Sequence, residues 1–164
     1  MVRRLLAAAV AVFALAGCAG APPVMDGTPS SGAPTPVAGY DWLLSDDPAE
    51  ARLAYGQPAS DDVQLALSCV PASGQLTLSR PASDGFTEIH LESGGETERF
   101  AAASEPSGIH DGTFLTASAT TGEPVFQRFR SVGWLAVLEG DGRTPLVAHP
   151  ASAPDIARFF ALCG

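Results

Sequence analysis

The stretch Val63-Gln64-Leu65-Ala66-Leu67-Ser68-Cys69 decides the fold of this 164-residue chain. Its apolar residues stand at every second position from Val63 to Cys69, a period of two that is typical of a half-buried β-strand. A turn of small residues follows at 71–74, and the alternation resumes with Leu76 and Leu78. Residues 62–79 are therefore predicted to form a β-hairpin.

Further strands are expected on both sides of this hairpin. Gly94-Gly95 and Gly140-Asp141-Gly142 mark the turns of two more hairpins. Residues 40–44 fit a strand or a docking segment, and residues 51–55 favour a strand over a short helix. The remaining predicted strands are 86–91, 97–103, 113–119, 134–139 and 145–149.

Two helices are expected in the second half of the chain. Pro124 suits a first helical turn and Gly133 a helix end, so this segment favours a short helix over a strand. At the C-terminal end Ser152 can cap a helix whose apolar stripe is Ile156, Phe159, Phe160 and Cys163. The whole pattern predicts an α+β fold. It consists of a mainly antiparallel sheet of six to eight strands, flat or barrel-like, closed by a C-terminal helix.

The first residues have the parts of an export signal. Arg3 and Arg4 precede an apolar run of 11 residues, Leu5 to Leu15, which is too short for a membrane span of about 20 residues. The simplest alternative is a secretory signal cut near Ala19 or Ala21. However, Leu15-Ala16-Gly17-Cys18 closely resembles the lipobox of bacterial lipoproteins.

This resemblance implies cleavage before Cys18 and attachment of two fatty acyl chains, such as palmitate, to its thiol. Two chains are enough for stable membrane anchoring. The protein is thus expected in the cell envelope, anchored to the membrane through Cys18. Because Ala19 stands where an aspartate would signal inner-membrane retention, the expected place in a Gram-negative host is the outer membrane, facing the periplasm.

The chain is expected to contain one folded domain. Residues 1–17 are the predicted signal peptide. Residues 18–38 are the lipidated cysteine and a disordered tether rich in Pro, Gly and Ser. Residues 39–164 are the predicted globular, β-rich domain.

The charge of the expected mature chain is strongly negative. The sequence contains no Lys, and removing Arg3 and Arg4 leaves seven Arg against 18 acidic residues, a formal charge of −11. No basic cluster is present to neutralise phosphates, so nucleic acid is excluded as a partner. The charge favours a basic protein partner, although solubility alone also explains it.

The two remaining cysteines are predicted to form a disulfide bond. Cys69 lies on the inward face of the clearest strand, and Cys163 lies on the apolar stripe of the final helix. The expected compartment is oxidising, and Cys18 is taken by lipid. Their spacing does not match zinc or redox motifs.

No pattern in the sequence indicates catalysis, a metal or a cofactor. His110-Asp111-Gly112 suits a turn better than a catalytic or metal site, because adjacent loop side chains point apart. The pairs Asp46-Asp47 and Asp61-Asp62 stand in turns, whereas a glycosidase needs two carboxylates across a cleft. His90 and His149 are interpreted as strand residues in preference to metal ligands. Trp42 and Trp134 are interpreted as core residues in preference to the lining of a ligand groove.

The preferred hypothesis is an envelope lipoprotein with a non-catalytic domain that binds a protein or a small ligand. A first alternative is an inhibitor of a cationic enzyme such as lysozyme. Lipoprotein lysozyme inhibitors are similar in size, acidity, β-content and their disulfide, but no motif matches residue by residue. A hydrolase is the second alternative.

Overall fold

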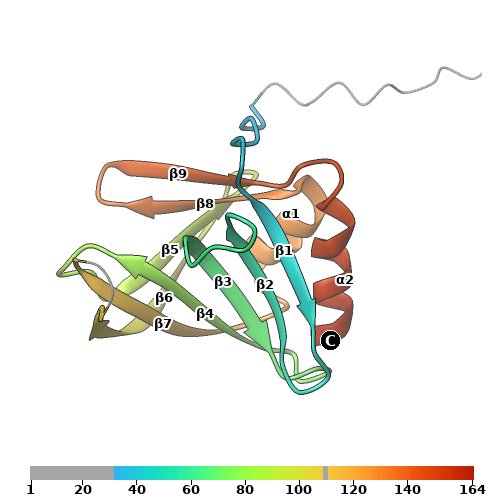
Figure 1. Cartoon of the computed structure of the whole chain (residues 1–164), viewed down its shortest axis with the longest axis horizontal. Coiled ribbons are helices and arrows are strands. Elements are labelled where there is room, and N and C mark those ends of the chain that lie inside the picture. The colour runs from blue at the N-terminus through green and yellow to red at the C-terminus, as the bar shows by residue number, and fades with distance from the viewer. Residues whose placement is uncertain (1–31, 109–110) are drawn as a thin grey trace, which may run out of the picture.

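The computed structural model describes residues 32–108 and 111–164 of the chain. In these residues it contains nine β-strands and two α-helices (Figure 1). The strands are β1 (Asp41–Asp46), β2 (Ala51–Gly56), β3 (Val63–Cys69), β4 (Gln75–Ala82), β5 (Glu88–Ser93), β6 (Glu96–Pro106), β7 (Thr113–Thr120), β8 (Trp134–Glu139) and β9 (Gly142–Val147). The helices are α1 (Pro124–Val132) and α2 (Ala153–Cys163).

The strands form one antiparallel sheet that curls into a nearly closed barrel. Their order is β1-β2-β3-β4-β7-β6-β5-β8-β9. The predicted class, a mainly antiparallel and barrel-like sheet with a C-terminal helix, is confirmed. The predicted number of six to eight strands is too low. Both ambiguous segments, 40–44 and 51–55, become strands that pair with each other from Asp41–Gly56 to Asp46–Ala51.

Two features of the strand pairing bend the sheet around the core. They are the long-range pairing of β4 with β7 and the change of partner along β6. β4 pairs with β7 along its whole length, from Gln75–Thr120 to Ala82–Thr113. β6 pairs first with β5, up to Ala101, and then with β7, from Ala102 onward. The predicted β5–β6 hairpin is thereby joined to the layer formed by β4 and β7.

The edge strands β1 and β9 meet at a seam that side chains complete. The Trp42 indole N–H donates a hydrogen bond of 3.2 Å to the carbonyl oxygen of Leu146. The Asp41 carboxylate accepts a hydrogen bond of 3.1 Å from the backbone N–H of His149 and another from the hydroxyl of Ser152. Ser152 is the N-cap residue of α2, as predicted, but its side chain makes this seam contact and forms no capping hydrogen bond with the helix.

Both helices lie on the same side of the barrel (Figure 1). α1 packs on β5 and β6, and α2 packs on β1 and β2. Phe126 and Phe129 of α1 and Phe159 and Phe160 of α2 are almost completely buried. The ring of Phe129 lies 4.8 Å from that of Trp42 and 6.1 Å from that of Phe160, measured between centroids. Aromatic contacts therefore connect the helices to the barrel core.

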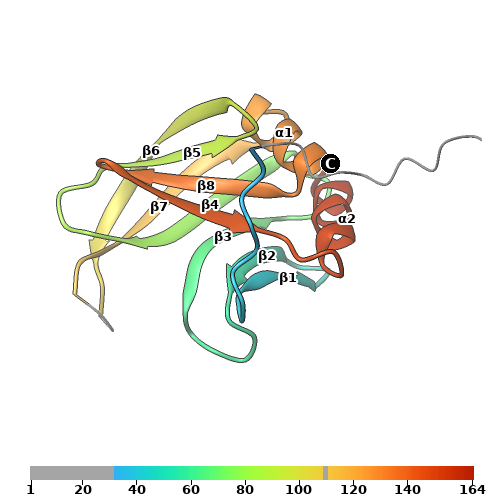
Figure 2. The ribbon, with the colours of Figure 1, turned by 90° about the horizontal axis from the view of Figure 1, so that it is seen from above.

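The segment that precedes β1 crosses the outer face of the β8–β9 hairpin (Figure 2). Ala33 lines the same hollow as Trp134 of β8, and the carbonyl oxygen of Val37 lies 3.3 Å from Nε2 of His149. The last part of the predicted tether is thus in contact with the domain. The rest of it, residues 18–31, lies outside the described residues.

Candidate functional site

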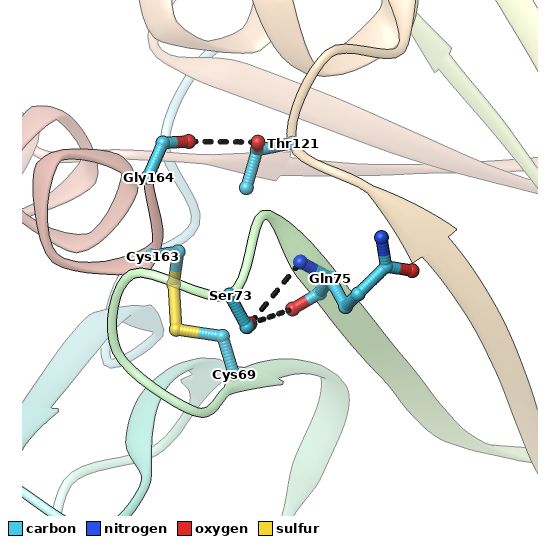
Figure 3. The surroundings of a disulfide bond; sticks show 6 residues. All are labelled: Cys69, Ser73, Gln75, Thr121, Cys163 and Gly164. Atoms are coloured by element: carbon cyan, nitrogen blue, oxygen red, sulfur yellow. Dashed lines mark hydrogen bonds between the residues drawn. A yellow bond between two sulfur atoms is a disulfide. The ribbon is translucent and has the colours of Figure 1, made fainter.

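The predicted disulfide bond between Cys69 and Cys163 is present, with the two sulfur atoms 2.01 Å apart (Figure 3). Both residues are buried. Hydrogen bonds of 2.8 Å hold the end of α2 at the same place, from the N–H of Gly74 to the carbonyl of Cys163 and from the Thr121 hydroxyl to the carbonyl of Gly164. These contacts join the β3–β4 turn and the residue after β7 to the end of α2, so this pair of cysteines has a structural role.

Two other predicted features lie outside the described residues. They are the lipobox with its lipidation residue Cys18, and His110. The end of the His110 loop is described at Gly112, which has a φ of 102°. A Cβ atom there would lie 2.4 Å from the carbonyl oxygen of Ala82. The positive φ and the lack of space for a Cβ atom both require glycine at this position. This is what a turn, in which the backbone conformation determines the residue type, leads one to expect.

The two tryptophans occupy different environments. Trp42 lies in the main core, with ring centroids 5.3 Å from Tyr55 and 4.8 Å from Phe129. Trp134 is buried in a small separate cluster on the outer face of the β8–β9 hairpin. There the guanidinium carbon of Arg143 lies 5.3 Å from the centroid of its ring. The prediction that both tryptophans are core residues therefore applies fully to Trp42. Trp134 is buried, but outside the main core.

A cleft of about 650 Å³ lies where β3 and β4 part. The ladder between these strands ends at the pair Ala66–Ser79, although β3 begins at Val63 and β4 continues to Ala82. The strands separate beyond that pair. Apolar side chains from three strands line the cleft; they are Val63, Pro81 and Phe114.

Two sets of contacts hold the banks of this cleft apart. On the β3 side, Asp62 accepts hydrogen bonds from the hydroxyl of Tyr40 and, at 2.7 Å, from the side-chain amide of Gln64. On the β4 side, Arg80 forms an ion pair of 2.7 Å with Glu139 of β8. The start of β3 is thereby tied to the segment before β1, and the end of β4 is tied to β8. The gap is consequently part of the folded structure.

The ion pair between Arg80 and Glu139 is largely shielded from water, with side chains 12% and 22% exposed. Burial by itself raises the pKa of Glu139, but hydrogen bonds from Arg80 and Ser83 outweigh it. The pKa of this carboxyl therefore lies below its ordinary value. Glu139 is ionised at neutral pH, so the contact that draws β4 toward β8 is intact there.

The mouth of the cleft is acidic. Asp61 and Asp62 come from the loop before β3, and Glu105 comes from the end of β6. Among the described residues that line the cleft, Arg52 alone is basic. Arg52 pairs with Ser68 of β3, on the side where the β3–β4 ladder is intact. Negative charge thus gathers at the open end of the cleft, and positive charge lies at its closed end.

Most of this charge is available to a partner. Asp61, Glu105 and Arg52 are exposed. Within the described part of the chain, their side chains make no hydrogen bond or ion pair. Phe114 beside them is 40% exposed. An incoming basic side chain can therefore pair with carboxylates at the mouth without breaking existing contacts.

The paired carboxylates noted in the sequence have different roles. Asp46 forms an ion pair with Arg158 of α2, and Asp47 accepts a hydrogen bond of 2.8 Å from the backbone N–H of Ala49. The pair Asp61-Asp62 lines the cleft. The sequence alone assigned Asp61-Asp62 to a turn. The one feature that could have indicated a role in the cleft is the position of this pair directly before the clearest strand.

The described residues contain no set of three metal-binding side chains close enough to hold an ion. Within the same ranges, no helix has the length and apolar character needed to cross a membrane. The pKa of His90, which stands on β5, is lowered by burial and by the nearby charge of Arg99. Comparison of the whole chain with protein-family models, curated proteins and solved structures finds no match.

Proposed function

We propose that this chain is an envelope lipoprotein whose barrel is a non-catalytic binding domain, and that the cleft between β3 and β4 binds a basic segment of a partner protein. The observation that carries the proposal is the open, partly apolar cleft with uncommitted carboxylates at its mouth. Lipid at Cys18 would hold the domain at the membrane. In a Gram-negative host, that membrane would be the outer membrane, with the domain in the periplasm.

Charge and shape both favour a basic segment. Among its described lining residues, the cleft has three carboxylates against one guanidinium, and the whole chain has a formal charge of −9. Such a field steers positively charged partners toward the site. The rings of Phe114 and Pro81 offer apolar surface to the aliphatic stems of Arg or Lys while their charged ends reach Asp61 and Glu105.

Peptide binding to variants tests the site. The probe is a fluorescein-labelled octapeptide of alternating arginine and valine, with capped ends, and the protein is lipid-free (Cys18→Ser). Asp61→Asn and Glu105→Gln should each weaken binding about two- to fivefold, as expected for exposed ion pairs of up to about 1 kcal/mol. Arg52→Gln should strengthen it by a similar factor.

Glu96→Gln is the matched control, because Glu96 is exposed at the opposite end of the same strand, β6. It removes the same charge without touching the cleft and should leave peptide affinity nearly unchanged. If Glu96→Gln weakens binding as much as Glu105→Gln, the peptide responds only to net charge and the cleft is not the site.

A basic loop of a cationic enzyme would fit the same cleft, so inhibition is tested with the same variants. The rate of lysozyme is measured with and without the lipid-free protein, at low and at physiological salt. Inhibition that persists at physiological salt and is weakened in Glu105→Gln, but not in Glu96→Gln, would make the partner an enzyme. Inhibition that disappears at moderate salt would reflect screened charge attraction only.

Lipid attachment is tested separately from binding. Metabolic labelling with a clickable fatty acid should mark the natural protein and leave Cys18→Ser unmarked. Equal labelling of the two proteins would contradict the lipoprotein assignment, and it would leave the cleft proposal to be judged on the peptide data.

A further inference from the structure

We infer that the bound segment joins the sheet as an additional β-strand. Its backbone pairs with the edge of β3 from which β4 has separated. This inference rests on the proposed function and specifies how the basic segment is held. Strand addition is a general mode of peptide recognition, in which main-chain hydrogen bonds give affinity and alternate side chains give specificity.

The first argument is the interrupted ladder. β3 and β4 pair only from Ala66–Ser79 to Ser68–Thr77. Residues 63–65 of β3 remain extended beyond this ladder, and Val63 and Leu65 stay paired with β2 on their other side, while Gln64 stands at an irregularity of that pairing. A strand that is paired on one side and bordered by a cleft on the other presents its backbone N–H and C=O groups as a template for another strand.

The second argument is that the bank formed by β4 is the poorer template. Pro81 has no backbone N–H to donate. The side chain of Arg80 is committed to Glu139 of β8. On its far side, β4 is fully paired with β7 through Ala82–Thr113. The backbone of the occupant is therefore expected to pair with β3, while its side chains contact β4 and β7.

The third argument concerns which side chains fit. Successive residues of a strand point to opposite faces of a sheet. Leu65 of β3 is fully buried, so residues of the occupant that point inward meet the apolar interior. Residues that point outward meet Asp61 and Glu105 at the mouth. The occupant is an extended segment in which basic and apolar residues alternate.

The probe is the arginine–valine octapeptide, compared with two versions of it. One version carries N-methyl groups on the arginine nitrogens, and the other carries them on the valine nitrogens. Methylation removes alternate N–H donors and so blocks one edge of an extended peptide. Affinities are measured by fluorescence anisotropy on the lipid-free protein, together with amide hydrogen exchange at Gln64 and Leu65.

Strand addition predicts an asymmetric result. One methylated peptide should lose at least tenfold in affinity, and the other should stay within about threefold of the parent. The parent should also slow exchange of the backbone amides measured at Gln64 and Leu65. Equal affinity of the two methylated peptides, with unchanged exchange, would overturn strand addition. The proposed function would survive that outcome if the parent still binds and Glu105→Gln still weakens it. Failure of the parent peptide to bind would overturn both.

Discussion

Removing the disulfide by Cys69→Ala together with Cys163→Ala should strongly destabilise the domain. The bond closes a loop with a sequence separation of 94. In the chain-entropy treatment, a loop of this length stabilises the folded state by roughly 4.7 kcal/mol at 25 °C, because it restricts the unfolded chain. Measured values are commonly smaller, so we expect a loss of about 3–5 kcal/mol.

Alanine is the appropriate replacement because Cys69 and Cys163 are only 4% and 0% exposed. Serine would bury two hydroxyl groups and add a desolvation cost of its own. With an unfolding entropy of roughly 2.1 cal/mol/K per residue over about 125 residues, the expected loss lowers the melting temperature by about 15 °C. Urea unfolding followed by circular dichroism gives the free energy, and calorimetry gives the melting temperature.

The native fold should persist in this variant at low temperature. The hydrogen bonds from Gly74 to Cys163 and from Thr121 to Gly164 do not involve the sulfur atoms. Phe159 and Phe160 still bury the inner face of α2. Near-ultraviolet circular dichroism should therefore match that of the natural protein. A loss of stability below about 1 kcal/mol would refute the argument that the cross-link acts by restricting a long loop.

Three further changes test other parts of the structure. Trp42→Phe keeps an aromatic ring but removes the hydrogen bond across the seam. It should lower the free energy of unfolding, measured in urea, by about 1–3 kcal/mol. An unchanged value would show that this hydrogen bond does not stabilise the seam. The pKa of Glu139 is lowered in the folded state, so its stabilising effect is complete above its unfolded pKa and is lost as pH falls through the lower, folded pKa. Acid should therefore reduce the melting temperature more in the natural protein than in Arg80→Met, and parallel pH profiles would contradict this. Deleting residues 32–38 in a Trp42→Phe background should expose Trp134, shift its fluorescence to longer wavelength and cost about 1–2 kcal/mol; identical emission would show that this segment does not cover the indole.

Local patterns were sufficient to predict most elements of the fold. The alternation from Val63 to Cys69 predicted β3, and the apolar stripe that ends at Cys163 predicted α2. Their inward faces then led to the disulfide, because a helix packed on the inner face of a sheet brings such residues together. These inferences needed only periodicity of two and of 3.6 residues and the expectation of an oxidising compartment.

The cleft could not be predicted in this way because it depends on contacts between distant residues. Arg80 continues the inward series of Leu76 and Leu78, yet nothing near it in the sequence indicates that its partner is Glu139. Asp61 resembles any turn aspartate until the separation of β3 and β4 places it beside Glu105. The β4–β7 pairing that positions these residues is likewise non-local, and strand order is not encoded in the pattern of a single strand.

The seam between β1 and β9 has a consequence for how the molecule assembles. The partners of β1 at the seam come from far along the chain, since Trp42 and Leu146 are separated by 104 positions and Asp41 and Ser152 by 111. Contacts of such high sequence separation form slowly, because the intervening chain must be ordered first. During synthesis, β1 and β2 can pair early, but the outer edge of β1 stays open until β9 and α2 arrive. Closure of the seam is therefore expected to be a late step, and the open edge of β1 is the place where a partly folded molecule is most exposed to pairing with a second copy.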